Sequence, residues 1–114
     1  MTPDDFRRVA NGMKDAIEDE HMGHPDFRTN NRIFATLHID GRHGMVKLDP
    51  DQQSDLIRAH PQVFTPASGA WGRGGSTMVL LENVDEMTLG EALTLAWQNA
   101  RRGAVRPRAR PRKT

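Results

Sequence analysis

The chain has 114 residues, of which 36% are hydrophobic, and this size and composition predict one small domain rather than two. The absence of cysteine excludes disulfides, thiolate zinc sites and a cysteine nucleophile. No apolar run approaches the roughly 18 residues of a membrane span, and residues 1–5 lack the layout of a signal peptide. We therefore expect a cytoplasmic protein with no membrane partner.

Charge is distributed unevenly along the chain. Residues 1–100 carry 9 basic and 15 acidic side chains, whereas residues 101–114 carry 7 basic side chains and no acid. The overall formal charge of +1 therefore combines a net of −6 with a net of +7. We predict an acidic folded domain over residues 1–100, followed by a basic Arg/Pro-rich tail over residues 101–114. The tail cannot bury apolar surface and is predicted to be disordered.

The first predicted helix begins after Thr2, whose hydroxyl can accept a free amide hydrogen, with Pro3 at the first helical position. Asn11-Gly12 favours an end at Gly12, followed by an extended stretch to Met22. A helix that continues to Glu20 is the alternative. The apolar residues at helical spacing are Phe6, Val9, Ala10 and Met13.

Strand signals follow. Asn30-Asn31 predicts a tight hairpin turn, because asparagine tolerates a positive φ. Residues 32–39 predict a strand that places Phe34 on one face and the remaining apolar side chains on the other, namely Ile33, Ala35, Leu37 and Ile39. A turn over 40–44 and a returning strand over 45–48 complete an antiparallel meander.

The second half of the chain begins with a helix capped by Asp49, with Gln52 closing the capping box and Pro61 ending the helix. Residues 66–76, which contain four glycines, predict a structured loop or bulged strand rather than a regular element. A buried strand is predicted over 77–81. Thr88-x-x-Glu91 predicts the capping box of a last amphipathic helix. This order of elements indicates an α+β fold, with a two-layer arrangement of an antiparallel sheet packed by helices.

Four separated segments of the sequence resemble the MmcQ/YjbR family, and the resemblance covers residues 1 to about 100. The segments are His21-Met22-Gly23-His24-Pro25-Asp26-Phe27-Arg28, Arg32-Ile33-Phe34-Ala35-Thr36-Leu37, Met45-Val46-Lys47-Leu48 and Gly69-Ala70-Trp71-Gly72-Arg73. The resemblance implies a compact domain with an antiparallel sheet, described in the family as a double-wing arrangement. It also implies a DNA-binding role, which is an analogy of fold. The tail is longer and more basic than the family's usual ending.

A DNA-binding surface needs several cations on one side of the molecule, because neutralised phosphates and released counterions supply most of the affinity. Alternatively, each cation is a solvated charge that protects a strand edge from pairing with another chain. The net charge of −6 over residues 1–100 opposes DNA binding unless the charges are segregated. The candidates in or beside strands and turns are Arg28, Arg32, Arg42, Lys47 and Arg73.

The tail is the stronger electrostatic candidate for contact with nucleic acid. It could also improve solubility, fold back on the acidic domain, or bind acidic partners and membranes weakly. Its candidate DNA-binding residues are Arg101, Arg102, Arg106, Arg108, Arg110 and Arg112.

Other kinds of site have little support. His21 and His24 are the only close histidine pair, but Gly23 and Pro25 disfavour the helix that would bring them together, so we predict no metal site. The serines lack a nucleophile elbow and the glycine-rich stretch is not a phosphate loop, so we predict no catalytic residues, no cofactor and no enzymatic activity.

Trp71 can be interpreted in two ways. We favour a packed indole in a glycine-rich bend, and the alternative is an exposed aromatic on which single-stranded bases stack. Phe34 is core if a helix covers its face, and Trp97 is core. The function predicted from the sequence is non-enzymatic DNA binding by strand and hairpin cations with help from the tail. The alternative is a protein-interaction module whose acidic domain binds a protein partner or forms a homodimer through its sheet.

Overall fold

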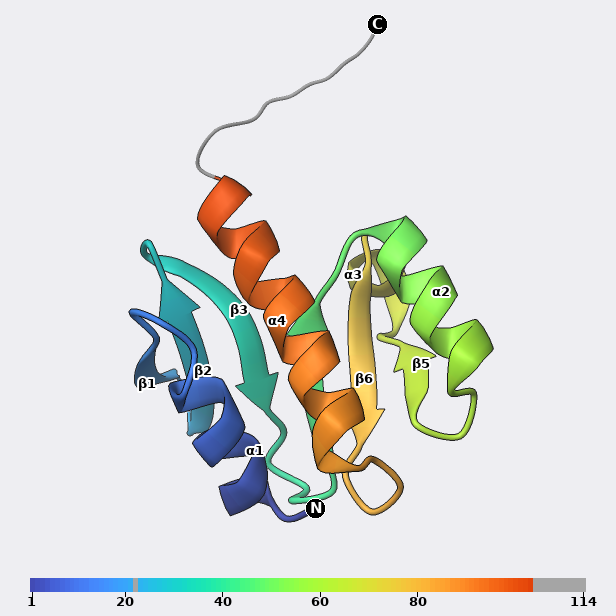
Figure 1. Cartoon of the computed structure of the whole chain (residues 1–114), viewed down its shortest axis with the longest axis horizontal. Coiled ribbons are helices and arrows are strands. Elements are labelled where there is room, and N and C mark those ends of the chain that lie inside the picture. Colours follow the sequence, from blue (N-terminus) through green and yellow to red (C-terminus); the bar gives the residue numbers. More distant parts are fainter. Residues whose placement is uncertain (22, 104–114) are drawn as a thin grey trace, which may run out of the picture.

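Six strands and four helices make up the part of the chain that this computed structural model describes, residues 1–21 and 23–103 (Figure 1). In chain order they are α1 (Pro3–Asn11), β1 (Ile17–His21), β2 (His24–Thr29), β3 (Arg32–Leu37), β4 (His43–Lys47), α2 (Pro50–Ala59), β5 (Phe64–Pro66), α3 (Gly69–Arg73), β6 (Ser76–Leu80) and α4 (Glu86–Gly103).

All six strands form one antiparallel sheet in the order β1-β2-β3-β4-β6-β5. The first four strands are a meander, and α2, β5 and α3 are inserted between the neighbouring strands β4 and β6. Helices α1 and α4 lie on one face of the sheet and α3 lies on the other (Figure 1). The predicted α+β class, an antiparallel sheet packed by helices, is confirmed.

Capping signals in the sequence predicted most of the helix ends correctly. Thr2 and Asp5 form the capping box of α1, which ends at Asn11, and Asp49 and Gln52 form the capping box of α2. The last helix begins earlier than predicted, at Glu86, because the Asp85 carboxylate accepts the amide hydrogen of Thr88 at 2.7 Å. The capping box predicted at Thr88 was therefore wrong, and Asp85 caps this helix.

The hairpin and strand predictions also hold in most places. Asn30 and Asn31 have φ values of 55° and 63°, as the tight turn requires, and Ile17–His21 is the predicted extended segment. The strand predicted to reach Ile39 ends at Leu37, and the Ile39 side chain is 77% exposed. The stretch over 66–76 is not the irregular loop that we expected, because it contains the short helix α3.

A β-bulge in β3 changes which side chains enter the core. Phe27 pairs with Ala35, but the next residue, Arg28, pairs with Ile33, so Phe34 is an extra residue without a partner. A bulge interrupts the alternation of side chains along a strand. Phe34 is therefore fully buried in the core beside Ala35 and Leu37, and Ile33 is displaced from it. The predicted face that combined Ile33 with Ala35 was wrong at this position.

The core lies between the sheet and the two helices α1 and α4. Phe6 of α1 packs on Phe27, with ring centroids 5.8 Å apart. Trp97 packs at the edge of this core, where its indole N–H donates to the Lys14 carbonyl at 2.8 Å. The core residues that α4 contributes are Leu89, Ala92, Leu93, Ala96 and Ala100.

Helix α4 continues through Gly103, so Arg101 and Arg102 are helical rather than part of a tail. The remaining tail residues lie outside the described part of the chain. None of the helices over residues 1–21 and 23–103 combines the length and the apolar character needed to cross a membrane.

At Gly44 the Phe6 ring of α1 packs directly on the backbone of β4. A Cβ atom there would lie 2.8 Å from Cζ of the buried Phe6 ring. We predict that Gly44→Ala lowers the free energy of unfolding by about 1–3 kcal/mol, because the ring has no space into which it can move. Chemical denaturation monitored by circular dichroism measures this change.

Gly90 in α4 supplies the matched control, since a Cβ there meets no atom within 4 Å. Gly90→Ala should raise the stability by up to about 1 kcal/mol through helix propensity. Equal effects of the two alanines would contradict the packing assigned to Gly44.

The turn between β3 and β4 contains a titrating group. Hydrogen bonds from the Arg42 amide and from the ring and amide of His43 lower the pKa of Asp40 from 3.8 to about 2. A lowered pKa in the folded state stabilises the fold above pH 3.8, and this contribution is lost as the pH falls toward 2. The melting temperature of Asp40→Ala should be below that of the wild type at pH 6. The difference should shrink between pH 4 and pH 2, and a constant difference would contradict the assignment.

Candidate nucleic-acid interface

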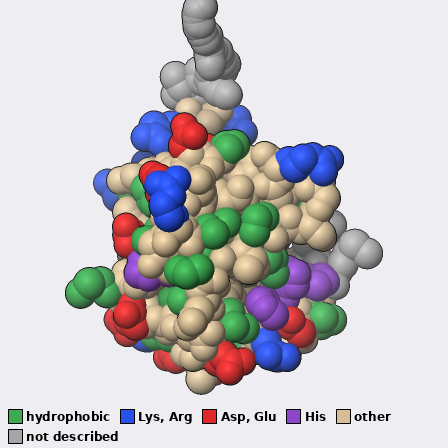
Figure 2. Space-filling model, turned by 90° about the vertical axis from the view of Figure 1, so that its right-hand side faces the viewer, with side chains coloured by type: hydrophobic (Ala, Val, Ile, Leu, Met, Phe, Trp, Pro, Cys, Tyr) green, Lys and Arg blue, Asp and Glu red, His purple; other side chains and the backbone are tan. Residues whose placement is uncertain are grey.

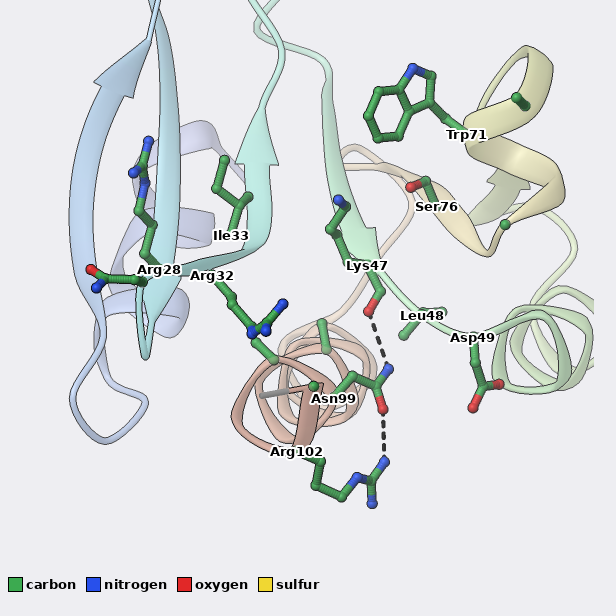
Figure 3. Close-up of a pocket in the computed structure, with 16 residues that line it drawn as sticks. Arg28, Arg32, Ile33, Lys47, Leu48, Asp49, Trp71, Ser76, Asn99 and Arg102 are labelled. Carbon is green, nitrogen blue, oxygen red and sulfur yellow. Dashed lines mark hydrogen bonds between the residues drawn. The ribbon is translucent and has the colours of Figure 1, made fainter. Parts of the chain in front are cut away.

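A groove opens where β3 and β4 separate. Their pairing ends at Ala35 and Val46, and the C-terminal turn of α4 lies beneath the gap between the strands. The cavity has a volume of about 1590 Å³. We call it the β3–β4 groove. Its lining comes from β2, β3, β4, α3 and α4 (Figure 3) and includes Arg28, Arg32, Lys47, Trp71, Asn99 and Arg102.

Trp71 stands on the rim of the groove. It is 70% exposed, and the Nζ atom of Lys47 lies 5.2 Å from the centroid of its ring. This distance is typical of a cation–π contact. The packed indole that we favoured from the sequence was therefore wrong, and the exposed aromatic beside a cation is the arrangement observed.

Two glycines explain why the side chain of Trp71 is directed outward. Gly72 packs so closely on Ala67 that an added Cβ would lie 2.8 Å from the Ala67 carbonyl carbon. Gly75 has a φ of 116° and packs equally closely on the backbone of Leu48. The backbone of α3 therefore lies against its neighbours, and the large side chain of Trp71 is directed outward.

Asn99 joins three of the elements around the groove. Its side-chain amide donates to the Lys47 carbonyl at 3.2 Å and its carbonyl accepts from Arg102 at 2.8 Å (Figure 3). The same amide also donates to Oε1 of Gln52 at 2.7 Å. These bonds fix the end of β4 against α4 and α2. They also hold the guanidinium of Arg102 at the groove. Sequence reasoning missed Asn99, because its partners are 47 and 52 residues away in the chain.

Arg28 differs from the other groove cations because a carboxylate neutralises it. Its guanidinium donates two hydrogen bonds to Asp26, at 2.9 and 3.1 Å, and Asp26 is only 2% exposed. The hydrogen bond to Asp26 raises the pKa of Arg28. The pair keeps the buried carboxylate satisfied, so Arg28 adds little net positive potential to the groove.

Arg32 lies at the opposite rim from Trp71. It begins β3 directly after the hairpin turn, and a Cβ added at Gly103 would lie 3.5 Å from its Cδ atom. The exposed side chain therefore lies against the last residue of α4. The β2–β3 hairpin and the end of α4 together close this side of the groove.

Several of the cations that line the groove are not neutralised by a carboxylate. Among the described residues, five Lys and Arg side chains have no carboxylate within 4.0 Å, namely Lys14, Arg32, Lys47, Arg73 and Arg102. Three of them line the groove. The acid that lines it, Asp49, accepts the Gln52 amide hydrogen at 2.7 Å as the cap of α2.

The other predicted cations lie elsewhere. Arg73 is exposed on α3 but does not line the groove, and Arg42 pairs with Glu82 at 3.3 Å. Arg101 lies 5.1 Å from the Trp97 ring and pairs with Asp15 at 3.3 Å. The candidates that lie outside the described residues are Arg106, Arg108, Arg110 and Arg112.

Three histidines, His24, His38 and His43, gather on a different part of the surface. The ring of His38 lies 6.5 Å from the rings of both His24 and His43. In the side view of Figure 2 the histidines visible on that face are mostly in its lower part, whereas most basic side chains lie in the upper half, toward the C-terminal end of α4. Over residues 1–21 and 23–103, no group of three or more potential ligands is arranged to hold a metal ion.

This chain is similar to a solved structure and to a known family. A crystal structure of the Deinococcus radiodurans protein DR2400, which has a DUF419 domain, is similar with a TM-score of 0.73 and 25% sequence identity. The similarity covers 90% of this chain and 80% of that chain. No curated protein matches the sequence. The sequence model of the YjbR family matches residues 11–99, which is most of the chain, and the resemblance found in the sequence is thereby confirmed. This chain belongs to the YjbR family.

Proposed function

We propose that this protein binds DNA and that the β3–β4 groove is the contact surface. The observation that carries the proposal is the convergence of three unneutralised cations, Arg32, Lys47 and Arg102, with an exposed indole in one groove. Cations on one surface supply affinity for a phosphate backbone by releasing its counterions. An exposed aromatic among them adds a surface for contact with a base or sugar.

The segments that carry the family resemblance also support this site. Arg28, Arg32, Lys47 and Trp71 come from the four separate segments, one from each, and all four line the groove. A groove that collects residues from all four segments is a better candidate site than the surface of His24, His38 and His43, to which three of the segments contribute no histidine.

The ion pairs keep many of the acids away from the groove, although the net charge of −6 over residues 1–100 is unchanged by them. Many acids over residues 1–100 are neutralised in ion pairs away from the groove, such as Glu18 with Arg7 and Glu86 with Arg8, both at 2.9 Å. The groove keeps its unpaired cations on the side where α4 ends. Such segregation produces a local positive potential on a molecule whose overall charge is small.

The tail adds further positive charge directly after the groove residues in the sequence. It continues from Gly103, which itself lines the groove, and residues 104–114 contain five further basic side chains. Any polyanion held in the groove is therefore near the start of a strongly basic segment. We propose that the tail raises the affinity without adding sequence specificity.

We propose a binding role rather than catalysis, and a cytoplasmic location.

The alternative function is association with a protein partner or a second copy through the sheet. The outer strands of the sheet do not favour it. The outer strand β1 carries Glu18, Asp19 and Glu20, and the other outer strand, β5, has three residues and contains Pro66. Charges and proline at a sheet edge discourage pairing with another chain.

The groove cations can be tested by a triple substitution. In the variant Arg32→Gln, Lys47→Gln, Arg102→Gln we expect the affinity for DNA to fall at least tenfold at low salt. The slope of log K against log salt should decrease by about 1 per residue removed. Fluorescence anisotropy of a labelled oligonucleotide across a salt series measures both quantities.

A matched control removes the same kind of charge elsewhere. Arg42 and Arg58 are exposed and pair with Glu82 and Asp55, away from the groove residues. Arg42→Gln with Arg58→Gln should leave the affinity within about threefold of the wild type. Equal losses in the two variants would show that binding follows net charge and not the groove.

The tail is tested by truncation after Gly103, which keeps the whole of α4. We expect the shortened chain to bind DNA more weakly but to remain sensitive to the groove substitutions. If truncation abolishes binding, the tail alone is the contact and the groove proposal fails. Anisotropy titrations of the two chains at the same ionic strength give the comparison.

A further inference from the structure

We propose that the β3–β4 groove binds single-stranded DNA in preference to a duplex, with an unpaired base stacked on the solvent-facing side of Trp71. This inference rests on the proposed function and specifies the form of its ligand. It is based on three observations: the indole is exposed, Lys47 lies against one face of its ring, and cations lie at the opposite rim of the groove.

The two faces of the indole ring are in different environments. Lys47 approaches one face, with its Nζ atom 5.2 Å from the centroid. Because the side chain is 70% exposed, the other face is open to solvent. An open aromatic face is the surface on which an unpaired base stacks, and any base can use it because every base has a π face.

The backbone segment that carries the indole is held in place before any ligand arrives. The side-chain amide of Gln53 donates to the carbonyls of Gly72 and Ser76, at 2.9 and 3.0 Å, and so braces α3 against α2 and β6. The close approaches of Gly72 and Gly75 restrict the same segment. A preorganised aromatic loses little conformational entropy on binding, so more of the stacking energy contributes to affinity.

Cations on both sides of the groove provide contacts for the backbone of the strand. Lys47 lies beside the indole, whereas Arg32 reaches from the β2–β3 hairpin toward the end of α4 and Arg102 lies beside Asn99 at that end (Figure 3). A flexible single strand can place a base on Trp71 while its neighbouring phosphates reach these cations. The combination of a cationic groove with an aromatic platform is typical of proteins that bind single strands.

A duplex matches this arrangement less well. Its bases are stacked on each other, so Trp71 can reach a base face only if a base step is opened, which costs a few kcal/mol. The remaining contacts to a duplex would be those of the phosphates with the cations. The indole would then contribute little to the affinity.

The test compares three labelled ligands of equal length, namely a thymidine single strand, the corresponding A·T duplex and an abasic single strand. Fluorescence anisotropy with the full chain should give a dissociation constant for the single strand at least fivefold lower than for the duplex or the abasic strand. The abasic strand keeps the phosphates and removes the bases, so it separates stacking from charge.

Substitution of Trp71 gives the second arm of the test. Trp71→Ala should weaken single-strand binding roughly tenfold, as expected for the loss of one stacked base, and should change duplex binding less than twofold. Trp71→Phe should recover most of the loss, because it keeps an aromatic face. Trp97→Phe, which alters an indole outside the groove, is the control and should bind like the wild type. Circular dichroism verifies that each variant is folded.

A direct optical readout uses the Trp97→Phe chain, in which Trp71 is the only indole. Stacking of thymidine should quench its fluorescence in parallel with the anisotropy change. Equal affinity for single strand and duplex, with no quenching and no effect of Trp71→Ala, would overturn this inference and leave DNA binding by the groove intact. Absence of binding to all three ligands would overturn both proposals.

Discussion

The extra residue that Phe34 adds to β3 determines which side chains of this strand enter the core and which lie at the groove. Without the bulge, Ile33 would alternate into the core with Ala35 and Leu37, and Phe34 would lie on the opposite face. With it, Phe34 fills the space beneath α4, and Ile33 pairs with Arg28 at the groove. The groove and the packing of α4 therefore depend on the same local irregularity.

The position of β4 at the groove also depends on α4. Asn99 bonds to the end of β4, to α2 and to Arg102, so the helix that packs on the core also sets the position of two groove cations. The stability of the core and the geometry of the cations are consequently coupled. A destabilised α4 would be expected to loosen the groove before the sheet itself separates.

Charge segregation reconciles an acidic domain with the polyanionic ligand that we propose. Over residues 1–21 and 23–103, most arginines outside the groove are paired with carboxylates, whereas Arg32, Lys47 and Arg102 are not. The sum of charges over residues 1–100 does not describe the field at any one surface. The field at the groove depends on which acids are already neutralised, and that depends on contacts between residues distant in sequence, such as Arg8 with Glu86.

The sequence by itself determined the local features of this protein. The capping boxes at Thr2 and Asp49, the turn at Asn30-Asn31, the α+β class and the family all follow from residues that are close in the chain, because helix caps and tight turns are local interactions. Arg28, Arg32 and Lys47 could be chosen as candidates in the same way, as cations beside strands.

Only the tertiary structure decided the features on which the candidate site depends. A bulge reversed the faces of Ile33 and Phe34, and close packing at two glycines directed Trp71 outward rather than into the core. The grouping of Arg32, Lys47 and Arg102 depended on where α4 ends relative to the sheet, and Arg101 on the same helix pairs with Asp15 instead. These outcomes are set by packing between segments tens of residues apart, and the pattern within any one segment does not contain that information.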